Sequence, residues 1–398
     1  MGVTTRTLGE ICNGVGGIIR TGPFGSQLHE SDYKDEGAPV IMPKNIIGGR
    51  VSIDGIARIG EEDAARLSHH RLKRGDIIYG RRGDIGRRAL ISEREDGWLC
   101  GTGCLRISLG ESVLESAFLY YYLGQPEVTA WIANQAIGAT LPNLNTSIIR
   151  SIPITYPSLP AQRKIASILS AYDDLIENNT RRIKIVEEMA QRLYREWFVH
   201  FRFPGHEKVK LIQSPLDPIP EGWEVKKLGD VIELAYGKAL KAEDRVDGLV
   251  QVYGSAGVVG YHNESLVKGP GIIVGRKGNV GSVYWSDDDF FPIDTVFYVV
   301  TEVCLHYVYN NLQTQNFLNN DAAVPGLNRN QAHRLPFLLP HENVLREFQR
   351  FVNIIFEQMR SLRTRNANLR HTRDLLLPKL ISGEVDVESM EVRISRDG

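Results

Sequence analysis

The chain has 398 residues, of which 42% are hydrophobic and 24% are charged, with a formal net charge of −1 and an isoelectric point near 6.8. This profile is typical of a globular protein with two domains, and it excludes a uniformly basic nucleic-acid binder. The sequence has no apolar run of membrane-spanning length and no secretory leader, and its four cysteines lack the spacing of a disulfide framework, so we expect a cytoplasmic protein.

Residues 1–156 predict a β-rich first domain. Short apolar runs at 40–42, 77–79 and 105–107 are separated by glycine and proline, which is the pattern of strands and turns. One helical stretch is expected around 117–136.

Residues 157–203 predict one long helix. Pro160 suits a first helical turn, and Pro204-Gly205 should end the helix. Apolar residues recur at alternating steps of three and four, which is the heptad spacing of a coiled coil. The positions of this seam are Leu169, Tyr172, Ile176, Asn179, Ile183, Val186, Ala190, Leu193 and Trp197.

The second half repeats this order. Residues 204–340 predict a linker and a second β-rich domain, with a helix near 304–319. A C-terminal spacer helix is expected within 341–383, with Pro378 as its end, and a tail is expected over 384–398. Its seam positions are Leu345, Phe348, Val352, Ile355, Met359, Leu362, Asn366, Leu369, Arg373 and Leu376.

The two long helices each need a partner for an apolar seam. Helices of about 40 residues would span about 60 Å. We expect them to pack on each other as an antiparallel coiled coil that separates two similar β-rich domains, which makes the fold α+β. Asn179 and Asn366 occupy seam positions, where a polar residue costs stability but fixes the register. The alternative is that each helix packs on its own domain.

Three sequence matches recur in the same order in both halves. Gly-Arg-Arg-Gly at 80–83 follows an apolar run, as Gly-Arg-Lys-Gly does at 275–278. The other two matched pairs are Leu-Pro-Asn-Leu-Asn at 141–145 with Val-Pro-Gly-Leu-Asn at 324–328, and Leu-Gly-Glu-Ile at 8–11 with Leu-Gly-Asp-Val at 228–231. We interpret the halves as diverged copies of one unit, which suits a protein that contacts two places on a long ligand.

Positive charge is concentrated in two segments. Residues 71–88 carry seven basic and two acidic side chains, and residues 360–379 carry six basic and one acidic. A polyanion responds to local charge rather than to the average, so the neutral total does not exclude nucleic acid as a partner.

The duplicated glycine and arginine loop is the strongest candidate for function. Glycine permits a tight turn and close backbone approach, and arginine can clamp a phosphate or contact guanine O6 and N7 through two donors. Asparagines of the second matched pair can contact adenine edges in a groove, whereas the alternative is that they cap their own backbone. For the loop itself, the alternative is an exposed hairpin with a hydrated basic tip.

Catalytic motifs are not recognisable in the sequence. It contains no Gly-x-x-x-x-Gly-Lys phosphate loop, no His-Glu-x-x-His zinc helix, no calcium-binding loop and no Asn-Pro-Pro-Tyr methyltransferase motif. We therefore expect a protein that is not an enzyme and that has no cofactor and no metal.

Five segments of the chain form a recognisable set. They are Gly-Pro-Phe-Gly-Ser-Gln-Leu at 22–28, the stretch 159–176, Trp-Phe-Val-His-Phe-Arg-Phe-Pro-Gly at 197–205, Gly-Trp at 222–223 and Leu-Leu-Pro-Lys-Leu-Ile-Ser-Gly at 376–383. These segments resemble the specificity (S) subunits of Type I restriction-modification systems, and the resemblance covers nearly the whole chain. The opening of the second long helix, Pro340-His341-Glu342-Asn343, departs from the Pro-x-x-Glu-Gln-like start that is common in the family.

This resemblance implies a DNA-binding scaffold whose two β-rich parts are target recognition domains for the halves of an asymmetric, two-part site. The helices would set the gap and bind two methyltransferase subunits, with restriction subunits joining the full complex. The alternatives are a coiled-coil adaptor between proteins, or a specificity subunit of another methylation-based defence system. The residues expected to contact double-stranded DNA are Ser26, Lys44, Asn45, Arg81, Arg82, Arg87, Arg88, Asn145, Lys238, Arg276, Lys277, Asn328 and Arg329.

Overall fold

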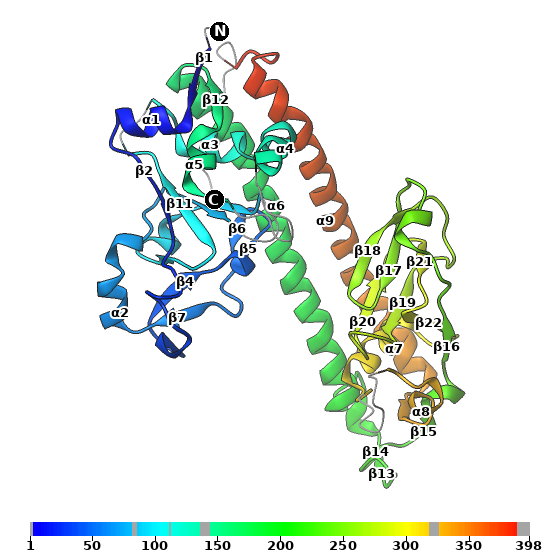
Figure 1. Cartoon of the computed structure of the whole chain (residues 1–398). Helices are drawn as coiled ribbons and strands as arrows, with labels where there is room; N and C mark the ends of the chain where they lie inside the picture. Colours follow the sequence, from blue (N-terminus) through cyan, green and yellow to red (C-terminus); the bar gives the residue numbers. More distant parts are fainter. Residues whose placement is uncertain (1–2, 82–85, 111–112, 136–143, 318–325, 388–398) are drawn as a thin grey trace. The chain divides into compact units, whose positions relative to one another are not determined.

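A computed structural model describes residues 3–81, 86–110, 113–135, 144–317 and 326–387 (Figure 1). The chain divides into two compact units. The first unit comprises residues 1–177 and 367–398, and the second comprises residues 178–366. Among the described residues, no helix combines the length and the apolar character needed to cross a bilayer.

The first unit contains two four-stranded sheets. The antiparallel sheet has the order β2 (Ile18–Thr21), β11 (Cys104–Ser108), β8 (Ile77–Gly80) and β9 (Arg88–Leu90). The mixed sheet has the order β10 (Leu99–Cys100), β4 (Ala38–Ile41), β7 (Ala57–Ile59) and β3 (Tyr33–Lys34), with β10 parallel to β4. Two-stranded ladders join β1 (Thr4–Thr7) to β12 (Pro153–Tyr156) and β5 (Ile46–Ile47) to β6 (Arg50–Val51).

The second unit repeats the antiparallel sheet of the first unit and three strands of its mixed sheet. Its antiparallel sheet has the order β16 (Glu233–Tyr236), β22 (Val296–Val300), β19 (Gly271–Gly275) and β20 (Val283–Ser286). Its mixed sheet has the order β18 (Gly257–His262), β17 (Val250–Gly254) and β21 (Phe290–Pro292), again with one parallel pair. Two-stranded ladders join β15 (Glu224–Lys227) to β23 (Pro336–Leu339) and β13 (Leu211–Ile212) to β14 (Ile219–Pro220). The internal repeat inferred from the sequence is therefore confirmed.

The repeat extends to residue register. Thr21 lies opposite Leu105 in the first unit, as Tyr236 lies opposite Phe297 in the second. The next residue in each strand, Gly22 or Gly237, donates its N–H to the carbonyl of the residue that precedes Leu105 or Phe297. Side chains at corresponding positions of the two copies can therefore be compared directly.

The shorter helices follow or precede strands in the sequence, and one expected helix differs from the structure. The stretch expected as one helix is two helices, because Gly124 and Pro126 interrupt it. The helix expected near 304–319 is α7, which ends at Thr314. The helices are α1 (Leu8–Gly14), α2 (Glu61–Arg66), α3 (Ser116–Tyr122), α4 (Pro126–Gln135), α5 (Thr146–Ser151), α7 (Leu305–Thr314) and α8 (Arg329–Ala332).

Two long helices, α6 (Leu159–Tyr194) and α9 (Glu342–Ser382), each contribute residues to both units. A π-helical turn, Arg195–Val199, follows α6 and buries Trp197 and Phe198. The expectation that Pro378 ends the second helix is wrong, because α9 continues to Ser382. The lost backbone hydrogen bond is offset by burial of Leu380 and Ile381 in the first unit's core.

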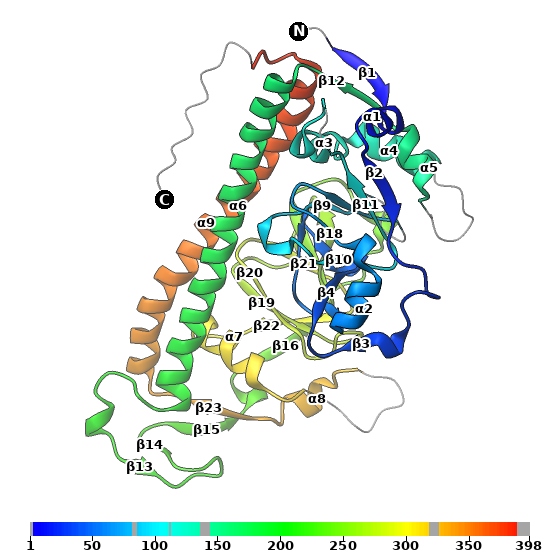
Figure 2. The same cartoon turned by 90° about the vertical axis from the view of Figure 1, so that its left-hand side faces the viewer.

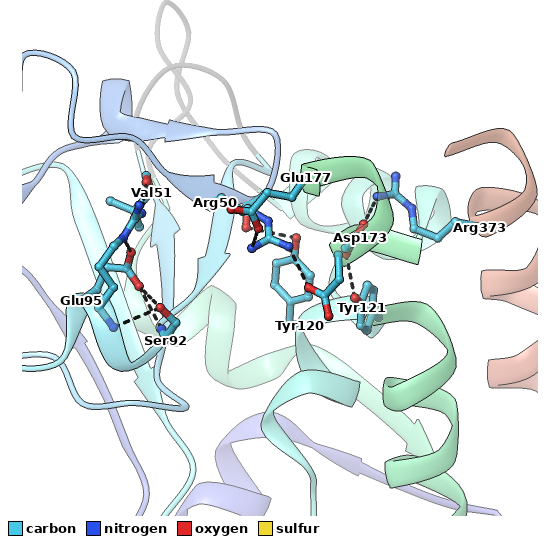
Figure 3. Close-up of polar contacts among 12 residues, drawn as sticks. Arg50, Val51, Ser92, Glu95, Tyr120, Tyr121, Asp173, Glu177 and Arg373 are labelled. Atoms are coloured by element: carbon cyan, nitrogen blue, oxygen red, sulfur yellow. Dashed lines mark hydrogen bonds and ion pairs between the residues drawn. The ribbon is translucent and has the colours of Figure 1, made fainter. Parts of the chain in front are cut away.

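The long helices pack antiparallel, as their seams predict, and Figure 2 shows them side by side. In the second unit, Asn179 donates to Asn366 Oδ1 at 2.9 Å, and Asn366 donates to Thr180 Oγ1 at 3.1 Å. The two polar seam residues are therefore joined by a hydrogen bond between the two helices. In the first unit, Asp173 of α6 pairs with Arg373 of α9 and accepts a hydrogen bond from the Tyr121 hydroxyl at 2.7 Å (Figure 3). Burial against Asp173 raises the pKa of Tyr121.

In each unit, the long helices also pack on the sheet-containing part. In the first unit, Ile165 and Leu169 share a core with Leu8 and Ile154, and Arg50 pairs with Asp174 at 3.2 Å and with Glu177 (Figure 3). In the second unit, the ring of Phe356 lies 4.8 Å from that of Trp285. The long helices therefore pack both on each other and on the β-rich parts, so the expected pairing and its alternative occur together.

Candidate nucleic-acid interface

The two duplicated motifs meet in each unit. In the first unit, Leu144 donates its N–H to the carbonyl of Arg81 at 2.9 Å. In the second unit, Leu327 donates to the carbonyl of Arg276 at 2.8 Å. The same hydrogen bond thus attaches the glycine and arginine loop to the start of a short helix in both copies. We refer to this arrangement as the loop–helix junction.

The shared geometry depends on an asparagine N-cap. Asn145 Oδ1 accepts the N–H of Ile148 at 2.9 Å and caps α5, while Asn328 Oδ1 accepts the N–H of Asn330 at 2.9 Å and caps α8. A capping asparagine satisfies N–H groups that the helix leaves unpaired. The capping alternative is therefore what the structure shows, and both residues position the junction.

The loop of the second unit holds Arg276 in a half-buried setting. Its backbone N–H donates to the Thr295 carbonyl at 2.9 Å, and its guanidinium donates to the Asp294 carbonyl at 2.8 Å. Gly278 and Gly281 have positive φ values of 78° and 77°, which explains why glycine occupies these turn positions. Lys277 is exposed and lies 3.7 Å from the Asp294 carboxylate.

The exposed ring of Tyr236 contacts two of the predicted arginines. The guanidinium groups of Arg276 and Arg329 each lie 5.0 Å from the centre of the Tyr236 ring. Lys238 is exposed and lies two residues after Tyr236. Its backbone N–H donates to the Pro292 carbonyl at 3.0 Å. Predicted site residues from three separate segments are therefore brought together, and a cationic surface with an exposed ring can bind phosphate or base edges.

The corresponding loop of the first unit differs. Arg81 is half-buried and donates its N–H to the Gly103 carbonyl at 2.9 Å, and Arg87 is exposed. Arg88 is held by Tyr120 instead, with its Nε donating to the Tyr120 carbonyl at 2.8 Å and its guanidinium 5.0 Å from that ring. Arg88 therefore has a structural role, which argues against its expected DNA contact. Arg82 lies outside the described residues.

Three further residues were expected to contact DNA. Ser26 and Lys44 are exposed, and their roles stay predictions. Asn45 is 1% exposed, accepts the Met42 N–H at 3.1 Å and donates to the Asp54 carbonyl at 3.4 Å. Its amide thus shapes its own loop, which argues against the expected DNA contact.

The basic segment of α9 is partly neutralised within the protein. Arg363 pairs with Asp287 at 2.7 Å, and Arg360 pairs with Asp288. These pairs and the one between Arg373 and Asp173 involve half of the six basic residues counted in this segment. The local charge inferred from the sequence therefore overstates the field that this helix presents to a polyanion.

No cluster of three His, Cys, Asp or Glu side chains suited to a metal ion occurs within the ranges that the structure describes. Cys100 and Cys104 are buried thiols, and burial raises the pKa of Cys100 to about 12.

Sequence reasoning missed Tyr236 and Tyr120, two tyrosines whose rings contact predicted arginines. Tyr236 directly precedes Gly237, whose equivalence to Gly22 of the first copy emerges only from the strand register. Tyr120 offers no sequence signal either, because its contact with Arg88 joins elements that are far apart in sequence.

Comparison with known proteins links this geometry to one family. The model of the Type I restriction modification DNA specificity domain matches residues 2–188 and 220–356. The chain is 25% identical to the Type I restriction enzyme MjaIX specificity subunit of Methanocaldococcus jannaschii, over 90% of this chain and 89% of that protein. It is 23% identical to the HindI specificity subunit of Haemophilus influenzae, over 79% and 87% of the two chains.

A solved structure shares the fold. The crystal structure of the Type I restriction-modification S subunit from M. genitalium aligns with a TM-score of 0.55 and 18% identity, covering 96% of both chains.

Proposed function

The chain belongs to the Type I restriction modification DNA specificity domain family, and from this premise we propose that it is the DNA-recognising subunit of a Type I restriction-modification complex. Each unit would bind one half of an asymmetric, two-part target through its loop–helix junction. Because α6 and α9 contribute to both units, the helix pair would link the two recognition events.

The observation that carries this proposal is a shared junction with different side chains. Both copies have the carbonyl-bound leucine and the asparagine cap. The positions that flank the junction differ, with Thr21 and Thr146 in the first unit where Tyr236 and Arg329 stand in the second. A common frame with different contact groups suits two recognition modules for two different base sequences.

The catalytic work would belong to partner subunits. Methyltransferase and restriction subunits would dock on the helices, with two methyltransferase subunits for the two quasi-equivalent units. Exposed apolar residues on the long helices, including Leu175, Met189 and Ile354, are available for such contacts.

A binding assay tests the proposed function. The chain would be assembled with its methyltransferase subunits and mixed with genomic fragments, and we expect sequence-selective retention that survives competition by unrelated duplex DNA. Assembly of the complex with no selective DNA binding would favour a protein adaptor instead.

Replacing the junction arginines should weaken this binding. We expect Arg81→Ala and Arg276→Ala each to reduce the free energy of binding to the target duplex by about 1–3 kcal/mol, because each removes a charged donor from the proposed contact surface. Titration at two salt concentrations measures the loss. Lys268→Ala is the control, since Lys268 pairs with Asp289 at 2.5 Å. If both arginine variants bind like the native chain, these loops do not contact DNA.

A further inference from the structure

Tyr236 gathers two arginines in the second unit. The ring is 50% exposed, and the guanidinium groups of Arg276 and Arg329 lie at equal distances of 5.0 Å from its centre. Arg276 also lies 5.8 Å from the ring of Phe297, which is opposite Tyr236 in β22. The cluster thus joins β16, the β19–β20 loop and α8.

The two guanidinium groups differ in how many donors are already engaged. Arg276 donates to the Asp294 carbonyl and is half-buried beside the neighbouring rings of Tyr236 and Phe297. Within the described part of the chain, the guanidinium of Arg329 contacts the Tyr236 ring and makes no hydrogen bond. A stacked guanidinium uses its flat face for the ring and keeps its edge donors for a ligand.

The backbone of Arg329 is fixed as well. It is the first residue of α8, directly after the Asn328 cap, and the neighbouring Leu327 is bonded to the Arg276 carbonyl at 2.8 Å. A side chain whose backbone and flat face are both held loses less conformational entropy on binding. Arg329 is therefore preorganised for a contact that demands a particular orientation.

The described residues of the first unit form no equivalent cluster at the corresponding positions. Thr21 occupies the register position of Tyr236, and Thr146 follows the Asn145 cap as Arg329 follows Asn328. The arginine and its ring are thus a difference between the two copies, superimposed on a shared frame.

We propose that Arg329, oriented by the Tyr236 ring, recognises a guanine in the half-site bound by the second unit. This inference rests on the proposed function. The guanidinium fork matches guanine O6 and N7, and a fixed plane favours such a two-point contact, whereas a two-point contact with a phosphate would carry no base preference. Tyr236 acts through Arg329 and is a positioning residue.

The test uses the chain in complex with its methyltransferase subunits. Binding is measured on duplexes in which each base pair of the target is replaced in turn. The native complex should discriminate against replacement of one G·C pair in the second half-site by roughly 10- to 100-fold. Arg329→Ala should lose that discrimination and keep the specificity of the first half-site. Tyr236→Ala should weaken it at the same base pair, and Tyr236→Phe should retain it.

A matched control separates specificity from charge. Arg334 is exposed and lies five residues after Arg329, so Arg334→Ala removes the same charge and should leave the base preference intact. Complex assembly by each variant shows that folding is retained.

If the native complex selects a target and Arg329→Ala keeps full discrimination at every position, the inference is overturned while the proposed function stands. Equal weakening on all duplexes, with reduced salt dependence, would identify a phosphate contact and also overturn it. A native complex that selects no target would overturn the proposed function itself.

Discussion

Leu362→Asp should lower the free energy of unfolding by about 4 kcal/mol. Leu362 is 2% exposed and lies in the seam of α9 between Met359 and Asn366. Truncation of a buried leucine costs about 2–5 kcal/mol, and a carboxylate in its place must also be desolvated without a partner. Urea unfolding followed by far-ultraviolet circular dichroism measures the change.

A matched variant on the same helix controls for helix propensity and charge. Ile354 is 67% exposed, so Ile354→Asp should change the unfolding free energy by less than about 1 kcal/mol. Equal stability of the two variants would show that Leu362 is not in a packed seam, and the antiparallel pairing of the helices would then lose its energetic basis.

Gly22→Ala should destabilise the chain by about 3 kcal/mol. A Cβ at this position would lie 2.0 Å from the carbonyl oxygen of Gly101, which is backbone and cannot move aside as a flexible side chain does. Relief of the overlap requires the end of β2 to move away from the backbone around Gly101. Such overpacking typically costs about 1–3 kcal/mol or more. Thermal unfolding of the purified variant measures the loss.

Two other glycines sharpen this test. A Cβ on Gly25, three residues later, would meet no described atom within 4 Å, so Gly25→Ala should be close to neutral. In the second unit, a Cβ on Gly237 would lie 2.1 Å from the Ile293 carbonyl oxygen, so Gly237→Ala should be as damaging as Gly22→Ala. A harmless Gly237→Ala would contradict the structural equivalence of these two positions.

The parts of the fold that were predictable depend on short-range patterns. The seam from Leu169 to Trp197 follows a spacing that an α-helix converts directly into one face, and those residues are buried or half-buried. Pro378 was misleading because its effect on the helix depends on tertiary contacts and not on a short-range pattern. Its local preference against helix is overcome by tertiary burial of the residues that follow it, and that burial is invisible in the local sequence.

The candidate site was predictable only in outline. Repetition of the loop motif identified Arg81 and Arg276, because a matched pair is visible without knowledge of the fold. Which ring holds each arginine depends on strand register and on contacts between distant segments. The sequence therefore could not separate Arg88, which Tyr120 holds, from Arg329, which stacks on an exposed ring.

Under the proposed function, two unlike recognition modules on one chain direct methylation to a two-part DNA target. The direct measurement is the adenine methylome of the host before and after deletion of the gene for this chain. We predict the loss of one methylated motif that has two defined halves separated by unspecified bases, and its return when the gene is restored. An unchanged methylome, or loss of a single uninterrupted motif, would contradict the account.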